Sequence, residues 1–539
     1  MPLLVLALLA CGTDPPAPMP DAPGAVDATH LYRAAIAMRG APPSAQDLAA
    51  YRADPTQLEP ILRSYLSDPG FAAAVRDQHA ETLKLRGHIV GKVPATGPLD
   101  GVSSAQLDID IDEMPLYLAS DIVTSGRPYT ELLTTELTFT NEATSIVHGL
   151  SYDPDGPTWQ PAPWTDGRPA AGILSDTAIL QRYQSSLSNH HRGRAAVVLS
   201  SVMCSEVLES TLDVVPPQIG EPSQDIVRTD PSCSGCHAAL DPVASAFSGF
   251  DPYILRTDIL DAYRAGCPEG APCYPLDFFD TEASGDWAAF DMPAPAWKGV
   301  PVDGLAGLGQ ALAADPDFAE CTARRFHGWH TGRDPWAVPD AVAQELADVL
   351  VEHSFDAREL VVASLLHEDF ATAPRRPIRP EEMARSVHAI TGYRWTRDLN
   401  GAVLDLPTSS RVGYRTLLGG TDGWDVLEPA RTPTPSAVLA REALAVRAGI
   451  HAVKRARDRA PAERTLFTVA APGPMSDDLA RKQLVVLHEL VLAMTLDDDD
   501  PAIDDALELL RALEAVDDAE TAWAWVLSAL LQHDRLVLP

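Results

Sequence analysis

The segment DPSCSGCHAALDP, residues 230–242, constrains the fold of this chain more than any other stretch. It contains the pattern Cys-x-x-Cys-His at Cys233, Cys236 and His237, in a chain with only 7 cysteines. Side chains at positions i, i+3 and i+4 share one face of an α-helix. The pattern therefore predicts a helical turn that presents two thiols and an imidazole side by side.

Three kinds of site fit this pattern. In a c-type haem site, Cys233 and Cys236 are bonded covalently to the haem and His237 is an axial ligand of the iron. A zinc site needs two further ligands, and His327 and His330 are candidates, although they lie much farther along the chain than in compact zinc modules. A thioredoxin-like dithiol lacks the βαβ pattern that would surround it. We favour one covalently attached haem c, with zinc or a structural dithiol as the alternatives.

The first residues of the chain indicate export. An apolar run from Leu3 to Ala10 is too short to span a bilayer as a helix, but it suits the core of an export signal. Leu8-Leu9-Ala10-Cys11 resembles the lipobox of bacterial lipoproteins, although no Lys or Arg precedes the run. We expect residues 1–11 to be a lipoprotein signal ending at the lipidation site Cys11, and residues 12–27 to be a Pro-rich tether. The protein is then extracytoplasmic and anchored to a bacterial membrane, on its periplasmic side or at the cell surface.

Charge limits the partners of the chain. With 41 Lys and Arg against 76 Asp and Glu, the net charge is −35. Such a chain is repelled by nucleic acid and by anionic membrane surfaces, so we expect no nucleic-acid partner and membrane contact only through the lipid anchor. An acidic surface instead favours a partner with a basic docking face.

The four remaining cysteines fit an oxidising compartment. Cys267 and Cys273 flank the turn-rich segment PEGAP, which a disulfide would close easily. Cys204 and Cys321 would then pair across the central region. Free buried thiols are the alternative, and the sequence alone leaves the connectivity open.

Helical signals dominate the rest of the chain and predict a mainly α fold of several domains. We expect an N-terminal helical domain at 28–150, a central domain with the Cys-x-x-Cys-His pattern at 170–375, and a C-terminal helical domain at 376–539. Four pairs of residues carry helix-boundary signals, namely Ser44 with Asp47, Thr56 with Glu59, Pro380 with Gly392, and Asp500 with Pro501.

A weak recurrence accompanies these helices. RSYLSDPGF (63–71), QALAADPDF (310–318) and VASLLHEDF (362–370) each finish a helical pattern with an acidic residue and Phe, and LSALLQHDRL (527–536) is a looser copy. We expect these segments to mark the ends of helical units near residues 71, 370 and 536.

Parts of the sequence resemble the large extracytoplasmic cytochrome-c-like proteins of planctomycetes and myxobacteria, whose domains are mostly of unknown function. The resembling stretches are GILSDTAILQRYQSSLSNHHRGRAAVVLSSVMC (172–204), RTDPSCSGCHAALDPVASAFSGFDPYILR (228–256) and PVDGLAGLGQALAADPDFAECTARRFHGWHTGR (301–333). The resemblance implies a central cytochrome-c-like haem region flanked by helical domains. It implies haem attachment at Cys233, Cys236 and His237, and a supporting framework of Asp241-Pro242, Phe250-Asp251 and Arg256.

The sixth iron ligand is open. Met292 lies downstream of His237, as the methionine ligand often does in c-type cytochromes, and is the first candidate. His327, His330 and Met203 are further candidates, and an open sixth position is another alternative. Arg192 and Arg256 are candidate partners of haem propionates.

Two functions of different classes follow. In the first, the chain is a lipid-anchored monohaem c-type cytochrome that exchanges electrons with an extracytoplasmic redox protein. In the second, it is a cell-surface binding or assembly protein in which the Cys-x-x-Cys-His segment is structural or binds zinc. Motifs of other active sites are absent, including G-x-S-x-G, the P-loop, H-E-x-x-H and G-x-G-x-x-G, so catalytic residues stay unassigned.

Overall fold

The computed structural model describes residues 27–87, 93, 95, 97–185, 189–205, 231–250, 274–399 and 401–539. Several predicted features lie outside these residues. They are the lipidation site Cys11 with its signal and nearly all of the tether, the cysteines Cys267 and Cys273, and the framework residues Asp251 and Arg256.

The mainly α fold predicted from the sequence is confirmed. The helices in the first part of the chain are α1 (Thr29–Arg39), α2 (Ala45–Ala53), α3 (Leu58–Tyr65), α4 (Pro69–Thr82), α5 (Ser104–Ser125), α6 (Glu142–His148), α7 (Thr177–Arg182), α8 (Arg192–Val197) and α10 (Pro231–Ser245). A π-helical turn, η6 (Val198–Val202), continues α8. The later helices are α12 (Gly304–Ala313), α13 (Pro316–Thr331), α14 (Asp340–Glu352), α15 (Ala357–Leu366), α16 (Glu368–Thr372), α17 (Pro380–Thr391), α18 (Tyr414–Leu417), α19 (Pro435–Arg457), α20 (Asp477–Leu492), α21 (Pro501–Glu514), α22 (Ala519–Leu530) and α23 (Asp534–Val537).

Strands are short and occur only as antiparallel pairs in the described part of the chain. β1 (Leu137–Thr140) pairs with β2 (Gln160–Pro163), with Leu137 opposite Pro163. β3 (Ala296–Trp297) pairs with β4 (Val300–Pro301), and β5 (Thr396–Leu399) pairs with β6 (Ala402–Asp405). Two-stranded pairs of this size are not stable alone, so helix packing must hold them in place.

Three of the four predicted helix boundaries are confirmed. Ser44 and Asp47 form a reciprocal capping box, Gly392 ends α17 in the left-handed conformation, and the Asp500 side chain caps α21 before Pro501. The pair of Thr56 with Glu59 is wrong. Asp54, two residues before the predicted cap, is the actual cap. Its carboxylate accepts a hydrogen bond from the backbone N–H of Thr56 and caps a short 3-10 turn.

A helix ends inside each recurrent segment, so the expectation that helical units end there is confirmed, and a second helix begins a few residues later in the same segment. Their side chains at the cap position each accept a backbone N–H two residues later, which begins the next helix. The four cap residues are Asp68, Asp315, His367 and His533. The apolar residue of each segment follows the cap by three positions and is buried, and these residues are Phe71, Phe318, Phe370 and Leu536. The recurrence is thus a cap followed by an anchor into the core.

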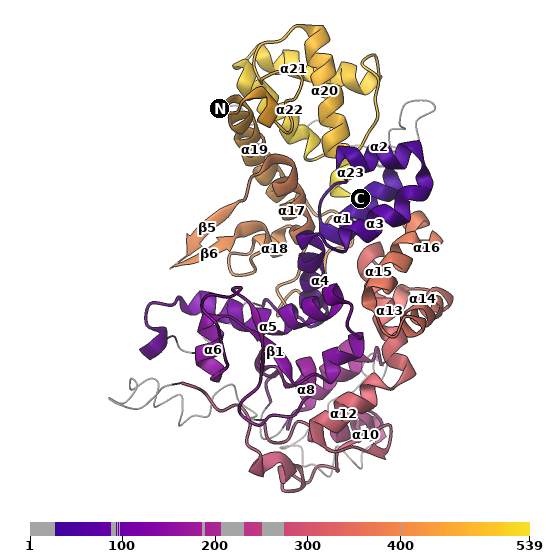
Figure 1. Cartoon of the computed structure of the whole chain (residues 1–539), viewed down its shortest axis with the longest axis vertical. Coiled ribbons are helices and arrows are strands. Elements are labelled where there is room, and N and C mark those ends of the chain that lie inside the picture. The colour runs from indigo at the N-terminus through magenta and orange to yellow at the C-terminus, as the bar shows by residue number, and fades with distance from the viewer. Residues whose placement is uncertain are drawn as a thin grey trace.

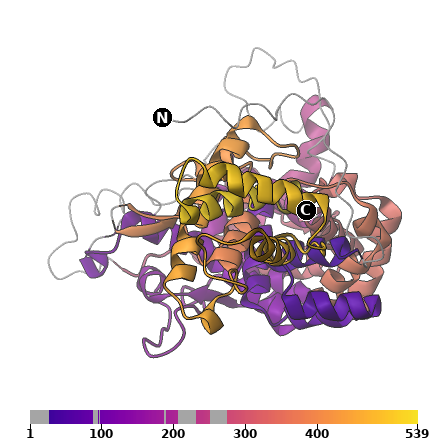
Figure 2. The same cartoon turned by 90° about the horizontal axis from the view of Figure 1, so that it is seen from above.

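The molecule is elongated, with the C-terminal helices α19 to α22 at one end and α10 and α12 at the other (Figure 1). Helices α1 to α3 lie between these ends, beside α13 to α16. Seen along the long axis, the C-terminal helices lie over the N-terminal ones (Figure 2). The chain end returns to the middle, because the backbone N–H of Ile378 donates to the carbonyl of Val537 at 2.9 Å.

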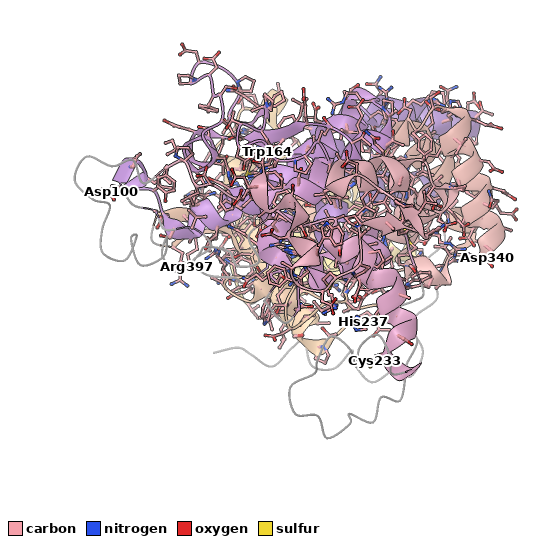
Figure 3. All side chains as sticks on the ribbon, turned by 90° about the horizontal axis from the view of Figure 1, so that it is seen from below. Asp100, Trp164, Cys233, His237, Asp340 and Arg397 are labelled. Carbon is pink, nitrogen blue, oxygen red and sulfur yellow. A yellow bond between two sulfur atoms is a disulfide. The ribbon has the colours of Figure 1, made fainter. Side chains whose placement is uncertain are left out.

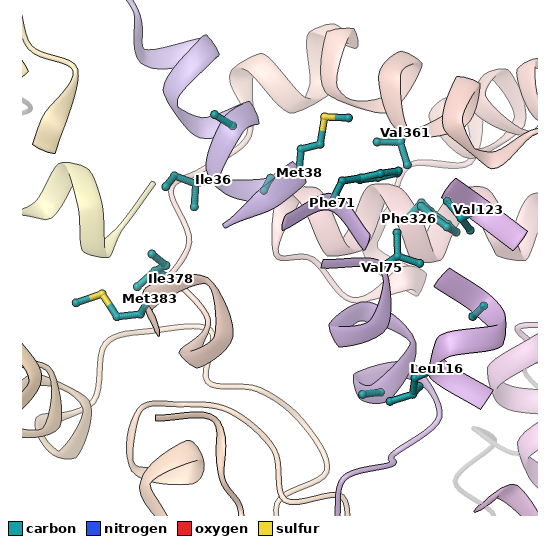
Figure 4. Close-up of a cluster of buried hydrophobic side chains, with 14 of the residues drawn as sticks. Ile36, Met38, Phe71, Val75, Leu116, Val123, Phe326, Val361, Ile378 and Met383 are labelled. Carbon is teal, nitrogen blue, oxygen red and sulfur yellow. The ribbon is translucent and has the colours of Figure 1, made fainter. Parts of the chain in front are cut away.

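One continuous hydrophobic core joins the three predicted regions. Figure 4 shows side chains from α1 and α4, such as Met38 and Phe71, beside Phe326 of α13 and Val361 of α15. Met383 of α17 belongs to the same cluster. Helix α1 packs on both α13 and α17, so helices of all three predicted regions meet there. The proposed domain boundaries stay a prediction. Among the described helices, none is long and apolar enough to cross a membrane.

Candidate haem-attachment site

The three residues of the Cys-x-x-Cys-His pattern lie on one helix, α10, as their spacing predicts. All three side chains are half-buried, so they are held by the protein and still reach its surface. Figure 3 shows this helix at the edge of the molecule, with Cys233 farther out than His237. Helix α10 packs against α8 and β3, which cover its inner side.

A chain of hydrogen bonds runs inward from His237. Its Nδ1 lies 2.9 Å from Oδ1 of Asp241, one helical turn further along α10. The guanidinium of Arg192, at the start of α8, grips the same carboxylate through Nε at 2.6 Å and Nη2 at 2.9 Å. Asp241 and Arg192 are both buried, at 4% and 8% exposure. This two-point contact fixes the carboxylate and, through it, the imidazole.

The charges of these hydrogen-bonded residues suit a metal-ligating histidine. Burial opposes ionisation of Asp241, but the hydrogen bonds from Arg192 and His237 outweigh it and hold the pKa of that carboxyl below its usual range. A charged carboxylate at Nδ1 keeps the proton there, which leaves Nε2 as the nitrogen with a lone pair. The donor set of two cysteines and an oriented histidine on one helical face therefore fits covalent haem.

Met292 lies in the same neighbourhood. Its side chain is buried, at 5% exposure, and its sulfur lies 3.3 Å from Nη2 of Arg192. The guanidinium therefore contacts both Asp241 and Met292. The fold connects this methionine to His237 through Arg192 and Asp241, although 55 residues of sequence separate the two (292 − 237 = 55).

The other candidate ligands lie in different surroundings. His327 and His330 of α13 both bond through Nδ1 to the hydroxyl of Ser364, at 2.9 and 2.8 Å. Nε2 of His327 also lies 2.9 Å from Asp369. Across the described ranges no group of three or more His, Cys, Asp or Glu is placed to hold a metal ion.

His190 was not singled out by the sequence analysis, yet it belongs to this site. Its ring stacks on Phe290 with centroids 4.4 Å apart, two residues before Met292, and its buried Nε2 has no hydrogen-bond partner among the described residues. Burial and the nearby Arg192 lower the pKa of His190, which keeps the imidazole neutral. The residue also has a positive φ of 42°, which is uncommon for a non-glycine residue and typical of constrained sites. The sequence signal that could have identified His190 is the pair His190-His191 directly before Arg192.

A disulfide joins Cys204 to Cys321, the pairing that the sequence analysis considered for these two cysteines. It links the residue just beyond η6 to the second turn of α13. The segment between these cysteines contains α10 and Met292, so the disulfide links the two ends of the segment that carries the site.

Removal of Arg192 is expected to lower the free energy of unfolding. Arg192→Met leaves the buried carboxylate of Asp241 with only the His237 imidazole as a hydrogen-bonding side chain among the described residues, and breaking a buried ion pair in this way costs about 3–5 kcal/mol. The double variant Arg192→Met/Asp241→Leu removes both charges and is expected to recover part of the loss. Urea unfolding of the two variants and the wild type measures this, and a double variant no more stable than the single one would contradict it.

Asp176 makes the stability of the fold depend on pH. It is fully buried as the cap of α7, and burial raises its pKa to about 6 despite hydrogen bonds from Ala178 and Thr138. The unfolded value is about 4, so the folded chain holds a proton that the unfolded chain has lost. This contribution to stability is present below about pH 4 and is lost as pH rises through 6, and it amounts to about 3 kcal/mol.

The variant Asp176→Asn keeps a cap and removes the titration. The wild type is expected to lose stability relative to this variant between about pH 4 and pH 7. Urea unfolding midpoints of both proteins across this range measure the difference. Parallel stability curves would show that Asp176 does not titrate in this way.

Residues 170–254 match one family model, PSCyt3, a protein of unknown function (DUF1588). The match covers a small part of the chain, but it includes Arg192, the whole Cys-x-x-Cys-His pattern and Asp241. The family name is consistent with the cytochrome-c-like proteins that the sequence resembles. No curated protein and no solved structure matches the chain.

Proposed function

We propose that this protein is a c-type cytochrome-like electron carrier with one haem attached at Cys233 and Cys236. The observation that carries the proposal is the hydrogen-bonded chain behind His237, because an imidazole oriented at Nδ1 by a buried carboxylate leaves Nε2 to ligate iron. The match of residues 170–254 to PSCyt3 supports the class of protein.

Each residue of the site has a separate role in this proposal. Cys233 and Cys236 would hold the haem through thioether bonds, and His237 would be a ligand of its iron. Asp241 orients His237, and Arg192 holds Asp241 in place. The bound haem would supply one reversible electron, and its potential would depend on ligands, hydrogen bonds and burial.

Location and partner belong to the same proposal. The lipobox-like segment ending at Cys11 supports an extracytoplasmic protein held to a membrane by lipid, where c-type haem is attached in bacteria. The net charge of −35 supports a redox partner with a basic docking face, and electron exchange with it would then slow as salt is added.

An optical spectrum tests the proposal. The protein is exported from a host that has haem-c maturation machinery, and its spectrum is recorded before and after dithionite, followed by extraction with acidified acetone. We expect a Soret band, reduced α and β bands, and colour that stays with the protein. A fully exported and folded but colourless protein would refute the proposal, and zinc analysis would then test the binding-protein alternative.

Met292 is the proposed sixth ligand, with His190 as the alternative that the structure adds. Met292→Ala in the haem-loaded protein is expected to convert the oxidised spectrum from low-spin to high-spin, because the iron loses a strong ligand. His190→Ala is the matched comparison at the same site. If only His190→Ala changes the spin state, the ligand is His190 and the assignment of Met292 is wrong.

A further inference from the structure

A second polar site lies away from α10, in a cavity of about 260 Å³. The end of α4, the turn η6, helix α13 and residues 428–431 form its walls. Five cations line it against three carboxylates, and these charged residues are Lys84, Arg325, Arg333, Arg379 and Arg431 against Glu81, Asp334 and Glu428. A net positive lining is unexpected in a chain with a net charge of −35.

The three carboxylates of the cavity are already paired with cations of its wall. Glu81 lies 3.3 Å from Arg379, and Glu428 lies 3.2 Å from Lys84. Asp334 lies 3.1 Å from Arg431. A further cation, Arg333, turns to Asp369 outside the cavity. These contacts leave Arg325 as the cation that no carboxylate neutralises at close range.

Arg325 is a well-placed anchor for an anion. Its Nη2 donates to the backbone carbonyl of Ser200 at 2.6 Å, and its buried Nε lacks a hydrogen-bond partner. No ion pair joins Arg325 to any described carboxylate within 4.0 Å. Burial lowers its pKa, but a guanidinium remains charged in proteins. The Arg325 side chain is half-buried and has no carboxylate at close range, so a bound anion would stabilise this arrangement.

The wall beside Arg325 is rigid. Arg379 lies flat on the indole of Trp329, with its guanidinium carbon 3.6 Å from the ring centroid. The same arginine donates to the carbonyl of Trp329 at 3.0 Å, so its position is set by two contacts. The disulfide of Cys321 also fixes α13 one turn before Arg325. Preorganised donors of this kind favour binding, because little side-chain freedom is lost when the ligand arrives.

We propose that this cavity binds a small oxyanion, either an inorganic ion such as phosphate or the carboxylate of a small organic acid, with Arg325 as its principal anchor. The forked guanidinium matches the paired oxygens of both sources. The site is independent of haem and goes beyond the proposed function. One continuous helical segment connects the two sites, because α8 begins at Arg192 and its continuation η6 reaches the cavity at Ser200.

Titration calorimetry on the purified full chain tests the site, with inorganic phosphate, sulfate and citrate as probes at low ionic strength. We expect saturable binding of at least one probe, weakened by added salt. Arg325→Gln is expected to weaken it by ~10-fold or more, because a charge-assisted contact is lost. Stronger binding of phosphate or sulfate would indicate an inorganic ion, and stronger binding of citrate an organic acid.

Two further variants keep the test decisive. Asp334→Asn retains the cap that Asp334 provides to the next turn and releases Arg431, so it is expected to tighten binding several-fold. Arg397→Gln is the matched control, because this arginine is exposed on β5 outside the cavity. If Arg325→Gln does not fold, unchanged affinity in Asp334→Asn overturns the proposal. Absence of binding by the wild type, or equal affinity in all variants, also overturns it.

Discussion

The double variant Cys233→Ala/Cys236→Ala is expected to carry no covalent haem after export from a host with haem-c maturation machinery. Both thioether bonds are lost, and His237 alone would hold the group only through a coordinate bond. Acidified acetone should then extract all colour from the variant and none from the wild type. Because the two cysteines are half-buried at the edge of the molecule, the fold itself is expected to survive.

The control for this variant comes from the same turn of α10. Ser234→Ala changes a neighbouring half-buried side chain and leaves both thiols in place, so its haem content should equal that of the wild type. Far-ultraviolet circular dichroism of all three proteins separates loss of haem from loss of structure. A double variant that retains acetone-resistant haem would show that attachment does not occur at these cysteines.

Removal of the disulfide is expected to give the largest change in stability. The bridge between Cys204 and Cys321 spans a sequence separation of 117 residues. Cross-linking residues so far apart restricts the unfolded chain strongly, and the stabilisation expected from chain entropy is about 5 kcal/mol. The variant Cys204→Ala/Cys321→Ala should therefore unfold at a much lower urea concentration than the oxidised wild type.

Reduction of the wild type provides the matched control for that variant. With the disulfide reduced, the wild type should unfold close to the double variant, since both lack the same constraint on the unfolded chain. Addition of reductant to the double variant should have no effect through this bridge. A stability difference below about 1 kcal/mol between oxidised wild type and variant would show that the bridge adds little to the fold.

The helical boundaries show how far the sequence alone could predict the fold. Caps such as Ser44 and Gly392 were found because their partners lie within four residues. The one wrong helix boundary also involves residues that are close in sequence. At Thr56 a better acceptor, Asp54, lay two residues earlier. In the recurrent segments the sequence predicts the helix ends but not the helices that start next, because an N-cap that closely follows one helix also looks like the last turn of that helix.

The site shows the same division. The grouping of Cys233, Cys236 and His237 on one helix follows from spacing, and even the contact of His237 with Asp241 spans a single turn. That contact was missed because Asp241 was read only as part of a framework. The sequence analysis missed His190, because only the structure shows that its Nε2 is buried without a hydrogen-bond partner among the described residues.

By itself the sequence determined the helical class, three of the four predicted helix boundaries and the helix that presents two cysteines and a histidine, since each depends on a local pattern of residues. Only the tertiary structure decided that Arg192 and Met292 meet Asp241, that Cys204 bonds to Cys321, and that one core joins the three regions. Those contacts join residues tens or hundreds of positions apart. Their free energy comes from burial and pairing that exist only after the chain has collapsed, and no local pattern encodes them.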